Sequence, residues 1–198
     1  MAKSKSKVKK NPIKKIKKIP VKEEKEPSKT KITFKISSIA AIIYAAIIIP
    51  VIMFGGIATG TLTLKLVDSV LLIILTILAV VILKSYYLLT KRKKFANIMT
   101  KVMIVFTIIV GVFNILKLYV LGPAIILYII AWAGGLVYIL FGIGLFQIKR
   151  VRLIFIILAV FYIIAGVFNA SLLLMVLLPA MAVTTAIVEA VVFRYLSR

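Results

Sequence analysis

Long uncharged stretches dominate the pattern of hydrophobic and polar positions in this chain. They cover residues 36–64, 118–148 and 153–188. About 20 apolar residues suffice to cross a bilayer, so each stretch can hold at least one membrane-spanning helix. The stretch 153–188 is long enough for two helices and must fold back on itself. Asn169 and Ser171 favour a turn and Pro179 suits the first turn of a helix, which places the reversal between Asn169 and Pro179.

The same pattern over the whole chain predicts an all-α polytopic membrane protein with six spans. Short loops separate these spans, and Pro50 inside the first of them is expected to kink that helix. The spans are predicted at 36–58, 64–89, 97–119, 123–147, 153–173 and 177–196.

An internal repeat organises these spans. A shift of 55 residues aligns IVFTIIVGVFN, which ends at Asn114, with AVFYIIAGVFN, which ends at Asn169, and 8 of 11 positions are identical. Pro123 and Pro179 then align within one residue. Recurrence at a fixed period is the signature of a repeated structural unit. The predicted unit is a two-helix hairpin of about 55 residues used three times, over about 36–94, 95–149 and 150–198.

This arrangement resembles the acid-resistance membrane proteins of the HdeD type over about residues 97–198. The resemblance rests on a helix that carries Gly, a Pro that opens the return helix, and the segment GLVYILFGI from Gly135 to Ile143. Two departures are visible, because Ala190–Arg198 carries no Gly and the first unit has its Pro inside the helix. The resemblance implies a stress-linked six-helix membrane protein built from paired-helix repeats.

Charge predicts the orientation of the chain in the membrane. The chain has 27 Lys and Arg, 5 Asp and Glu, and a net charge of +22. Six spans place 25 of the 27 basic residues on one side and leave Lys65 and Lys117 on the other. Since Lys and Arg near span ends mark the cytoplasmic side, we expect a multi-pass protein of the cell membrane with both termini in the cytoplasm.

Residues 1–35 form a basic tail that precedes the transmembrane domain, residues 36–198. The tail holds 14 Lys, three Pro and few aromatic residues, a composition that favours disorder. Anionic lipid headgroups attract Lys near a membrane surface by about 1 kcal/mol each, so we expect lipid contact through Lys14, Lys15, Lys17 and Lys18. Nucleic-acid binding is the alternative for a polybasic tail, but no aromatic interleaving supports it. Self-association into a homo-oligomer stays open.

Composition excludes several kinds of chemistry. The chain contains no Cys and no His, so thiolate and imidazole metal sites and Cys-His or Ser-His catalytic pairs cannot form. At plausible depth in the membrane, paired carboxylates and phosphate-binding loops are also lacking. We therefore predict no enzyme activity, no catalytic residue, no metal ligand and no cofactor.

Glu189 and Lys84 form the candidate intramembrane polar site. Charges within a span are costly and usually face protein or water. Helical rise places Glu189 about 7.5 Å, and Lys84 about 10 Å, inside the cytoplasmic boundary. The comparable depth suggests an ion pair between the second and sixth spans. In the alternatives, Lys84 snorkels while Glu189 pairs with Arg194 or is protonated, or Glu189 serves a proton or ion relay.

Asn114 and Asn169 form a repeat-equivalent polar pair toward the outer ends of their helices. They either cap and turn the chain or hydrogen-bond across a pseudo-symmetric interface. Near the span ends Tyr86, Tyr87, Tyr119 and Tyr195 are predicted to be interfacial anchors.

Small residues predict where the helices touch, because lipid offers no hydrophobic drive and close backbone approach holds spans together. In the fourth and sixth spans they recur at helical spacing on one face. The predicted packing residues are Ala131, Gly135, Gly142, Ala182, Ala186 and Ala190.

The sequence leaves the molecular task open. A non-catalytic structural or stress-related membrane protein fits every feature. The alternative is a small channel or transporter that uses Glu189, a class in which several intramembrane polar groups or interrupted helices are typical.

Overall fold

The computed structural model describes residues 28–55, 62–119, 124–148, 152–171 and 177–198. Each predicted span corresponds to one α-helix. The helices are α1 (Ser28–Gly55), α2 (Leu62–Thr90), α3 (Lys94–Tyr119), α4 (Ala124–Leu145), α5 (Arg152–Ser171) and α6 (Leu178–Leu196).

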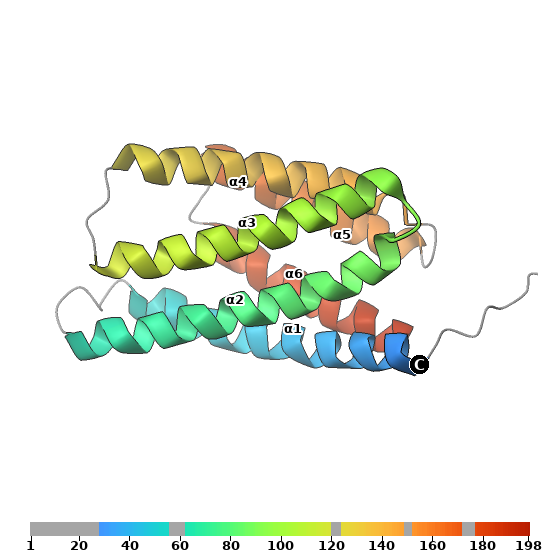
Figure 1. The fold of residues 1–198 in the computed structure, drawn as a ribbon, viewed down its shortest axis with the longest axis horizontal. Coiled ribbons are helices and arrows are strands. Elements are labelled where there is room, and N and C mark those ends of the chain that lie inside the picture. Colours follow the sequence, from blue (N-terminus) through green and yellow to red (C-terminus); the bar gives the residue numbers. More distant parts are fainter. Residues whose placement is uncertain (1–27, 56–61, 120–123, 149–151, 172–176) are drawn as a thin grey trace, which may run out of the picture.

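All six helices are long and apolar enough to cross a membrane. They run up and down along a common long axis (Figure 1). Large apolar side chains cover their outward surfaces, with exposed fractions of 57% for Ile77 and Val105. Such a surface suits lipid as the solvent, so the described chain is a polytopic helical membrane protein.

The first helix begins earlier than predicted. It starts at Ser28, so residues 28–35 are helical and the predicted tail boundary at Lys35 was wrong. Phe34 explains the difference, because it is fully buried and stacks on Phe193 of α6 with ring centroids 6.2 Å apart. Helix formation thus extends past the apolar run into a charged segment, where packing on α6 stabilises it.

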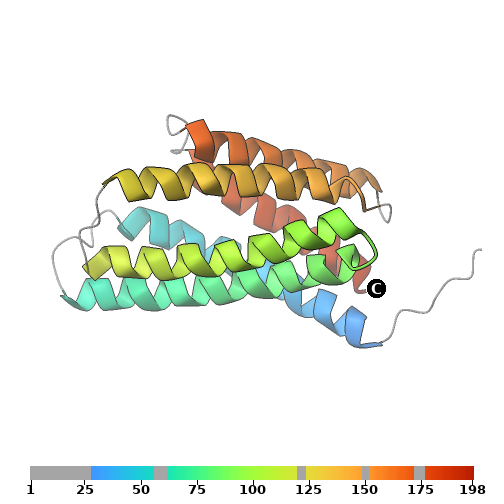
Figure 2. The same cartoon turned by 45° about the horizontal axis from the view of Figure 1, so that its top comes forward.

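The helices pack in chain order, and the circle closes where α1 meets α6. Lys31 Nζ donates a hydrogen bond to the backbone oxygen of Arg198 at 2.9 Å, which holds the start of α1 beside the end of the chain. The α2–α3 connection lies at that same end of the bundle (Figures 1 and 2). This end, which we call the basic end, therefore gathers Lys31, Lys91, Lys94, Arg194 and Arg198.

The closest helix packing joins α4 to α5. A Cβ added at Gly135 would lie 2.6 Å from the Gly166 carbonyl oxygen, and one at Gly142 would lie 2.7 Å from that of Ala159. The backbones thus meet directly, as small residues permit in membranes. Gly135 and Gly142 lie on this contact, as their spacing suggested.

The other predicted packing residues are divided between contacts. Ala186 and Ala190 are buried on α6, and the Ala190 backbone oxygen accepts a hydrogen bond from Ser38 Oγ of α1 at 2.8 Å. Ala131 and Ala182 are half-buried. Pro50 lies inside α1, as predicted, and α5 ends at Ser171 while α6 begins at Leu178, so the reversal falls where it was expected.

Candidate functional site

The carboxylate of Glu189 is the centre of the candidate site. Its side chain is only 4% exposed. Two phenol hydroxyls donate hydrogen bonds to the same oxygen, Oε1, from Tyr86 at 2.8 Å and from Tyr162 at 2.5 Å. These three residues, which we call the Glu189 cluster, come from α6, α2 and α5, so one carboxylate oxygen joins three helices.

Aromatic rings enclose the Glu189 cluster. The Tyr86 ring makes edge contacts with Phe141 and Phe193, at centroid distances of 5.3 and 5.2 Å. Phe141 lies edge-on to Tyr162 at 4.8 Å, and Tyr138 stacks on the Tyr162 ring at 6.0 Å. Edge and offset contacts of this kind add about 0.5–1.5 kcal/mol per pair beyond burial. The two hydroxyl donors are therefore held by packing before they meet the carboxylate.

The local sequence around Glu189 explains why the helices can approach so closely. Thr185, Ala186 and Ala190 lie on its side of α6, and all three are buried. Short side chains at these positions leave room for the phenol rings that reach in from α2 and α5. The predicted packed face of α6 is thus the face that carries Glu189.

Lys84 is not the partner of Glu189. Lys84 is exposed on α2, and no ion pair joins the two side chains among the described residues. The reason is helical geometry, because residues two positions apart point in different directions. Once Tyr86 faces Glu189, Lys84 points away from it toward the membrane.

Arg194 does not pair with Glu189 either. It lies in the last turn of α6 and is exposed, and the hydrogen bonds of the carboxylate come from the two tyrosines. Lys84 and Arg194, the two partners predicted for Glu189 from their charge, therefore do not pair with it, and its hydrogen bonds come from neutral hydroxyl groups.

Tyr86 corrects a second expectation. It was predicted to be an interfacial anchor, yet it is 0% exposed and lies at the centre of the core. Tyr195, in contrast, is 59% exposed, as an anchor should be. Sequence reasoning missed Tyr86 and Tyr162 as partners of Glu189. The available signal was the position of both tyrosines inside predicted spans, since a phenol hydroxyl within one span can donate a hydrogen bond to a carboxyl group of another.

The repeat-equivalent asparagines both lie toward the outer ends of their helices, as predicted. Asn114 lies in the last third of α3, which ends at Tyr119, and Asn169 lies in the last turn of α5, which ends at Ser171. The amide nitrogen of Asn169 is 2.8 Å from where a Cβ would stand on Gly134 of α4. α4 packs against both α3 and α5, and no hydrogen bond joins Asn114 to Asn169 in the described part of the chain.

Short hydroxyl side chains form a second group of interhelical hydrogen bonds that the sequence analysis left out. Ser37 Oγ of α1 donates to the Val81 backbone oxygen of α2 at 2.9 Å, and Ser85 Oγ donates to Ser37 Oγ at 2.8 Å. Thr90 of α2 and Thr100 of α3 share a hydrogen bond of 3.2 Å. Hydroxyls within spans were the signal, since they join helices in membranes at about 0.6–1.7 kcal/mol each.

The lysines predicted to contact lipid, Lys14, Lys15, Lys17 and Lys18, lie outside the described residues. Within the described part of the chain, no three His, Cys, Asp or Glu side chains gather where they could hold a metal ion.

Comparisons of this chain with protein-family models, with curated proteins and with solved structures give no match. The described residues define a polytopic membrane protein with six spanning helices, and function has to be argued from the site.

Proposed function

We propose that this protein is a non-catalytic, structural or stress-related protein of the cell membrane, in which the Glu189 cluster locks α2, α5 and α6 together. The observation that carries this proposal is the pair of hydroxyl hydrogen bonds on Glu189 Oε1 inside an aromatic shell. A carboxylate whose partners belong to the protein stabilises the helix arrangement. We propose on the same grounds that no enzyme activity and no cofactor belong to this chain.

The form of α6 supports a structural role. Transporter sites near the bilayer midplane are typically built on interrupted helices, whose free backbone groups bind the substrate or ion. Here α6 is one continuous helix from Leu178 to Leu196, and Glu189 lies within it. The rings of Phe141, Phe155 and Phe193 are at most 1% exposed around the cluster.

Proton flux through purified protein in liposomes tests this proposal. We expect wild-type vesicles to lose an imposed pH gradient at the rate of empty vesicles, and Glu189→Gln to change nothing. Asp68→Asn, at the other buried acidic residue of the described chain, is the matched control.

A small channel or transporter is the second candidate, because a buried acidic side chain with two hydroxyl donors can also form part of a proton relay. Flux above the empty-vesicle rate that falls at least tenfold in Glu189→Gln and persists in Asp68→Asn would establish it and would overturn the structural proposal.

We also propose that both termini lie in the cytoplasm. The contact of Lys31 with Arg198 supports placing them on one side, and the charge of the basic end supports assigning that side to the cytoplasm. The tail lysines would then face anionic lipid of the inner leaflet.

Cysteine labelling tests the orientation cleanly, since the chain has no Cys of its own. In intact cells, a membrane-impermeant maleimide is expected to label Thr63→Cys at the start of α2 but neither Ser6→Cys nor Lys91→Cys until the membrane is opened. The reverse pattern would show the opposite orientation, and labelling of Ser6→Cys without Lys91→Cys would contradict the even number of spans.

We further propose that the chain is built from three hairpin repeats, in the manner of the HdeD-type proteins that it resembles. Packing of two repeat-equivalent glycines supports the repeat, because each lies against the helix that precedes its own. A Cβ at Gly111 of α3 would meet the Thr76 side chain of α2, whereas one at Gly166 of α5 would meet the Gly135 backbone oxygen of α4. A stress-linked role is what the resemblance adds to this architecture.

A further inference from the structure

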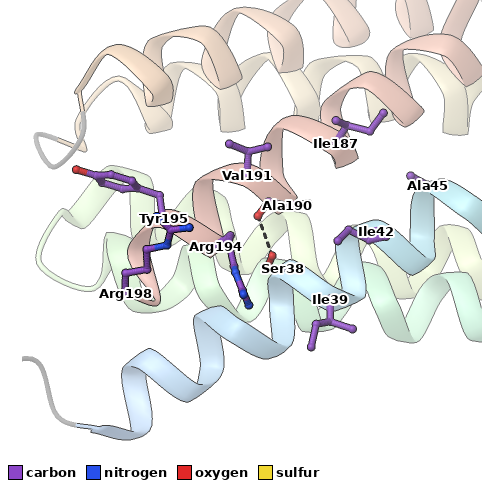
Figure 3. Close-up of a pocket in the computed structure, with 10 residues that line it drawn as sticks. All are labelled: Ser38, Ile39, Ile42, Ala45, Ile187, Ala190, Val191, Arg194, Tyr195 and Arg198. Carbon is purple, nitrogen blue, oxygen red and sulfur yellow. Dashed lines mark hydrogen bonds between the residues drawn. The ribbon is translucent and has the colours of Figure 1, made fainter.

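An apolar groove runs along the outer surface between α1 and α6, away from the Glu189 cluster. It encloses about 550 Å³ and ends among arginines (Figure 3). Ligand pockets of about 300–1,000 Å³ with apolar walls and few polar groups are typical of small-molecule sites. The groove therefore has the size and composition of a ligand site, and it opens toward lipid.

The walls of the groove come from branched aliphatic side chains. Ile39 and Ile42 of α1 and Ile187 and Val191 of α6 line it (Figure 3), and their exposed fractions lie between 48% and 61%. At its floor, Ser38 Oγ donates its hydrogen bond to the Ala190 backbone oxygen. Since the Ser38 hydroxyl already has a hydrogen-bond partner within the protein, the floor of the groove suits an apolar occupant.

One end of the groove is strongly basic. Arg194 projects from α6 toward α1, and Arg198 lies at the same end, while Ile187 and Ala45 lie at the other (Figure 3). The acidic residues of the described chain are Asp68 and Glu189, and Glu189 is engaged by Tyr86 and Tyr162. Neither arginine forms an ion pair within the described chain, so their charge is open to an external anion.

From this combination of aliphatic walls and two arginines at one end, we propose that the groove binds an anionic glycerophospholipid. The lipid comes from the leaflet at the basic end, with one acyl chain along Ile39, Ile42, Ile187 and Val191 and its phosphate at Arg194 and Arg198. Helical rise gives about 16 Å between Ile187 and Arg198. This matches half of the bilayer hydrocarbon thickness of about 30 Å, which is the depth that one acyl chain occupies.

Charge argues against the other occupants of such a groove. The tail that precedes α1 carries 14 Lys over residues 1–35, so its segments are repelled by Arg194 and Arg198. A second copy in the same orientation would bring its own arginines to the same depth, and like charges opposite each other are destabilising. An anionic lipid complements both the aliphatic walls and the basic end.

Native mass spectrometry of the full-length protein in detergent tests this proposal. Phosphatidylglycerol is titrated against phosphatidylcholine of the same acyl chains, and the dissociation constant of the tightest-bound lipid is measured. We expect phosphatidylglycerol to bind at least tenfold more tightly than phosphatidylcholine, and the double variant Arg194→Gln/Arg198→Gln to remove that preference. Two headgroup contacts of about 1 kcal/mol each correspond to roughly 30-fold in affinity.

Two matched controls separate the groove from general charge attraction. Lys91→Gln/Lys94→Gln removes the same charge from exposed positions at the basic end and should keep the preference for phosphatidylglycerol. The tail lysines are present in every variant. Val191→Trp, which fills the groove and leaves both arginines, should weaken lipid binding, whereas Val105→Trp on the outer surface of α3 should not.

Three lipid-binding results would overturn the proposal. They are equal binding of the two lipids by the wild type, an arginine variant that binds like the lysine control, and full displacement of phosphatidylglycerol by millimolar inorganic phosphate. The last result would reveal an anion site without an acyl-chain groove. Dimers that form in place of lipid adducts and vanish in Val191→Trp would assign the groove to a second copy instead.

Discussion

Gly135→Ala is expected to destabilise the bundle by about 2 kcal/mol, within the range of about 1–3 kcal/mol for overpacking a tight contact. The new methyl group would stand 2.6 Å from the Gly166 backbone oxygen and 2.8 Å from the Ala170 backbone nitrogen. Backbone atoms cannot rotate aside as a side chain can, so α4 and α5 must separate. The loss can be measured by reversible unfolding in mixed detergent and SDS.

The same helix supplies the matched control for this substitution. In Gly144→Ala the methyl group would meet Ala96 of α3, at 3.2 Å from its Cα and 3.6 Å from its Cβ, a contact that a shift of a few tenths of an ångström relieves. Both substitutions raise helix propensity by about the same amount, up to 1 kcal/mol. Gly144→Ala should therefore be neutral or slightly stabilising. Equal stability of the two variants would show that the α4–α5 contact is looser than the geometry indicates.

The helix positions could be predicted from the sequence because a membrane restricts the length and composition of the segments that cross it. A span needs about 20 apolar residues and must satisfy its backbone hydrogen bonds internally. The apolar segment between Lys65 and the basic cluster that begins at Lys91 therefore placed α2 within two residues of its observed bounds at either end. The start of α1 at Ser28 was missed because Phe34 is held by a contact with Phe193, at the far end of the chain.

The candidate site was only half predictable for a related reason. The free-energy cost of a charge in lipid identified Glu189 as a group that must face protein. The small residues near it on α6 indicated which face of the helix is packed. The identity of its partners depended on the rotation of α2 and α5 about their own axes, which a uniformly apolar helix does not reveal. Its opposite charge suggested Lys84 as the partner of Glu189, but Tyr86, two residues later on α2, is the side chain that faces inward.

Charge patterning misled in one further way. Opposite charges at similar depth look like a pair, yet an ion pair in a low-dielectric interior has to repay the desolvation of two charges. Two tyrosine hydroxyls supply hydrogen bonds to the carboxylate without a second buried charge. Lys84 can meanwhile extend its aliphatic stem along α2 and place its ammonium group toward the headgroups.

Glu189→Leu is expected to cost about 3 kcal/mol in the same unfolding assay. The substitution removes the acceptor of Tyr86 and Tyr162 and leaves two buried hydroxyls unpaired, each worth about 1–3 kcal/mol when unsatisfied. Glu189→Gln keeps an amide oxygen as acceptor, so its cost should be about 1 kcal/mol, the difference between a charge-assisted and a neutral hydrogen bond. Tyr195→Phe, which removes a hydroxyl from a side chain that is 59% exposed, should leave stability unchanged.

Removing the donors together with the acceptor distinguishes hydrogen bonding from packing. The triple variant Glu189→Leu/Tyr86→Phe/Tyr162→Phe has no hydroxyl left to satisfy and keeps every ring contact that surrounds the cluster. When both partners of a buried hydrogen bond become apolar, the change in stability can be nearly neutral, so the triple variant should regain most of what Glu189→Leu loses. A triple variant as unstable as Glu189→Leu alone would mean that the shape of the glutamate side chain, and not its two hydrogen bonds, holds α2, α5 and α6 together.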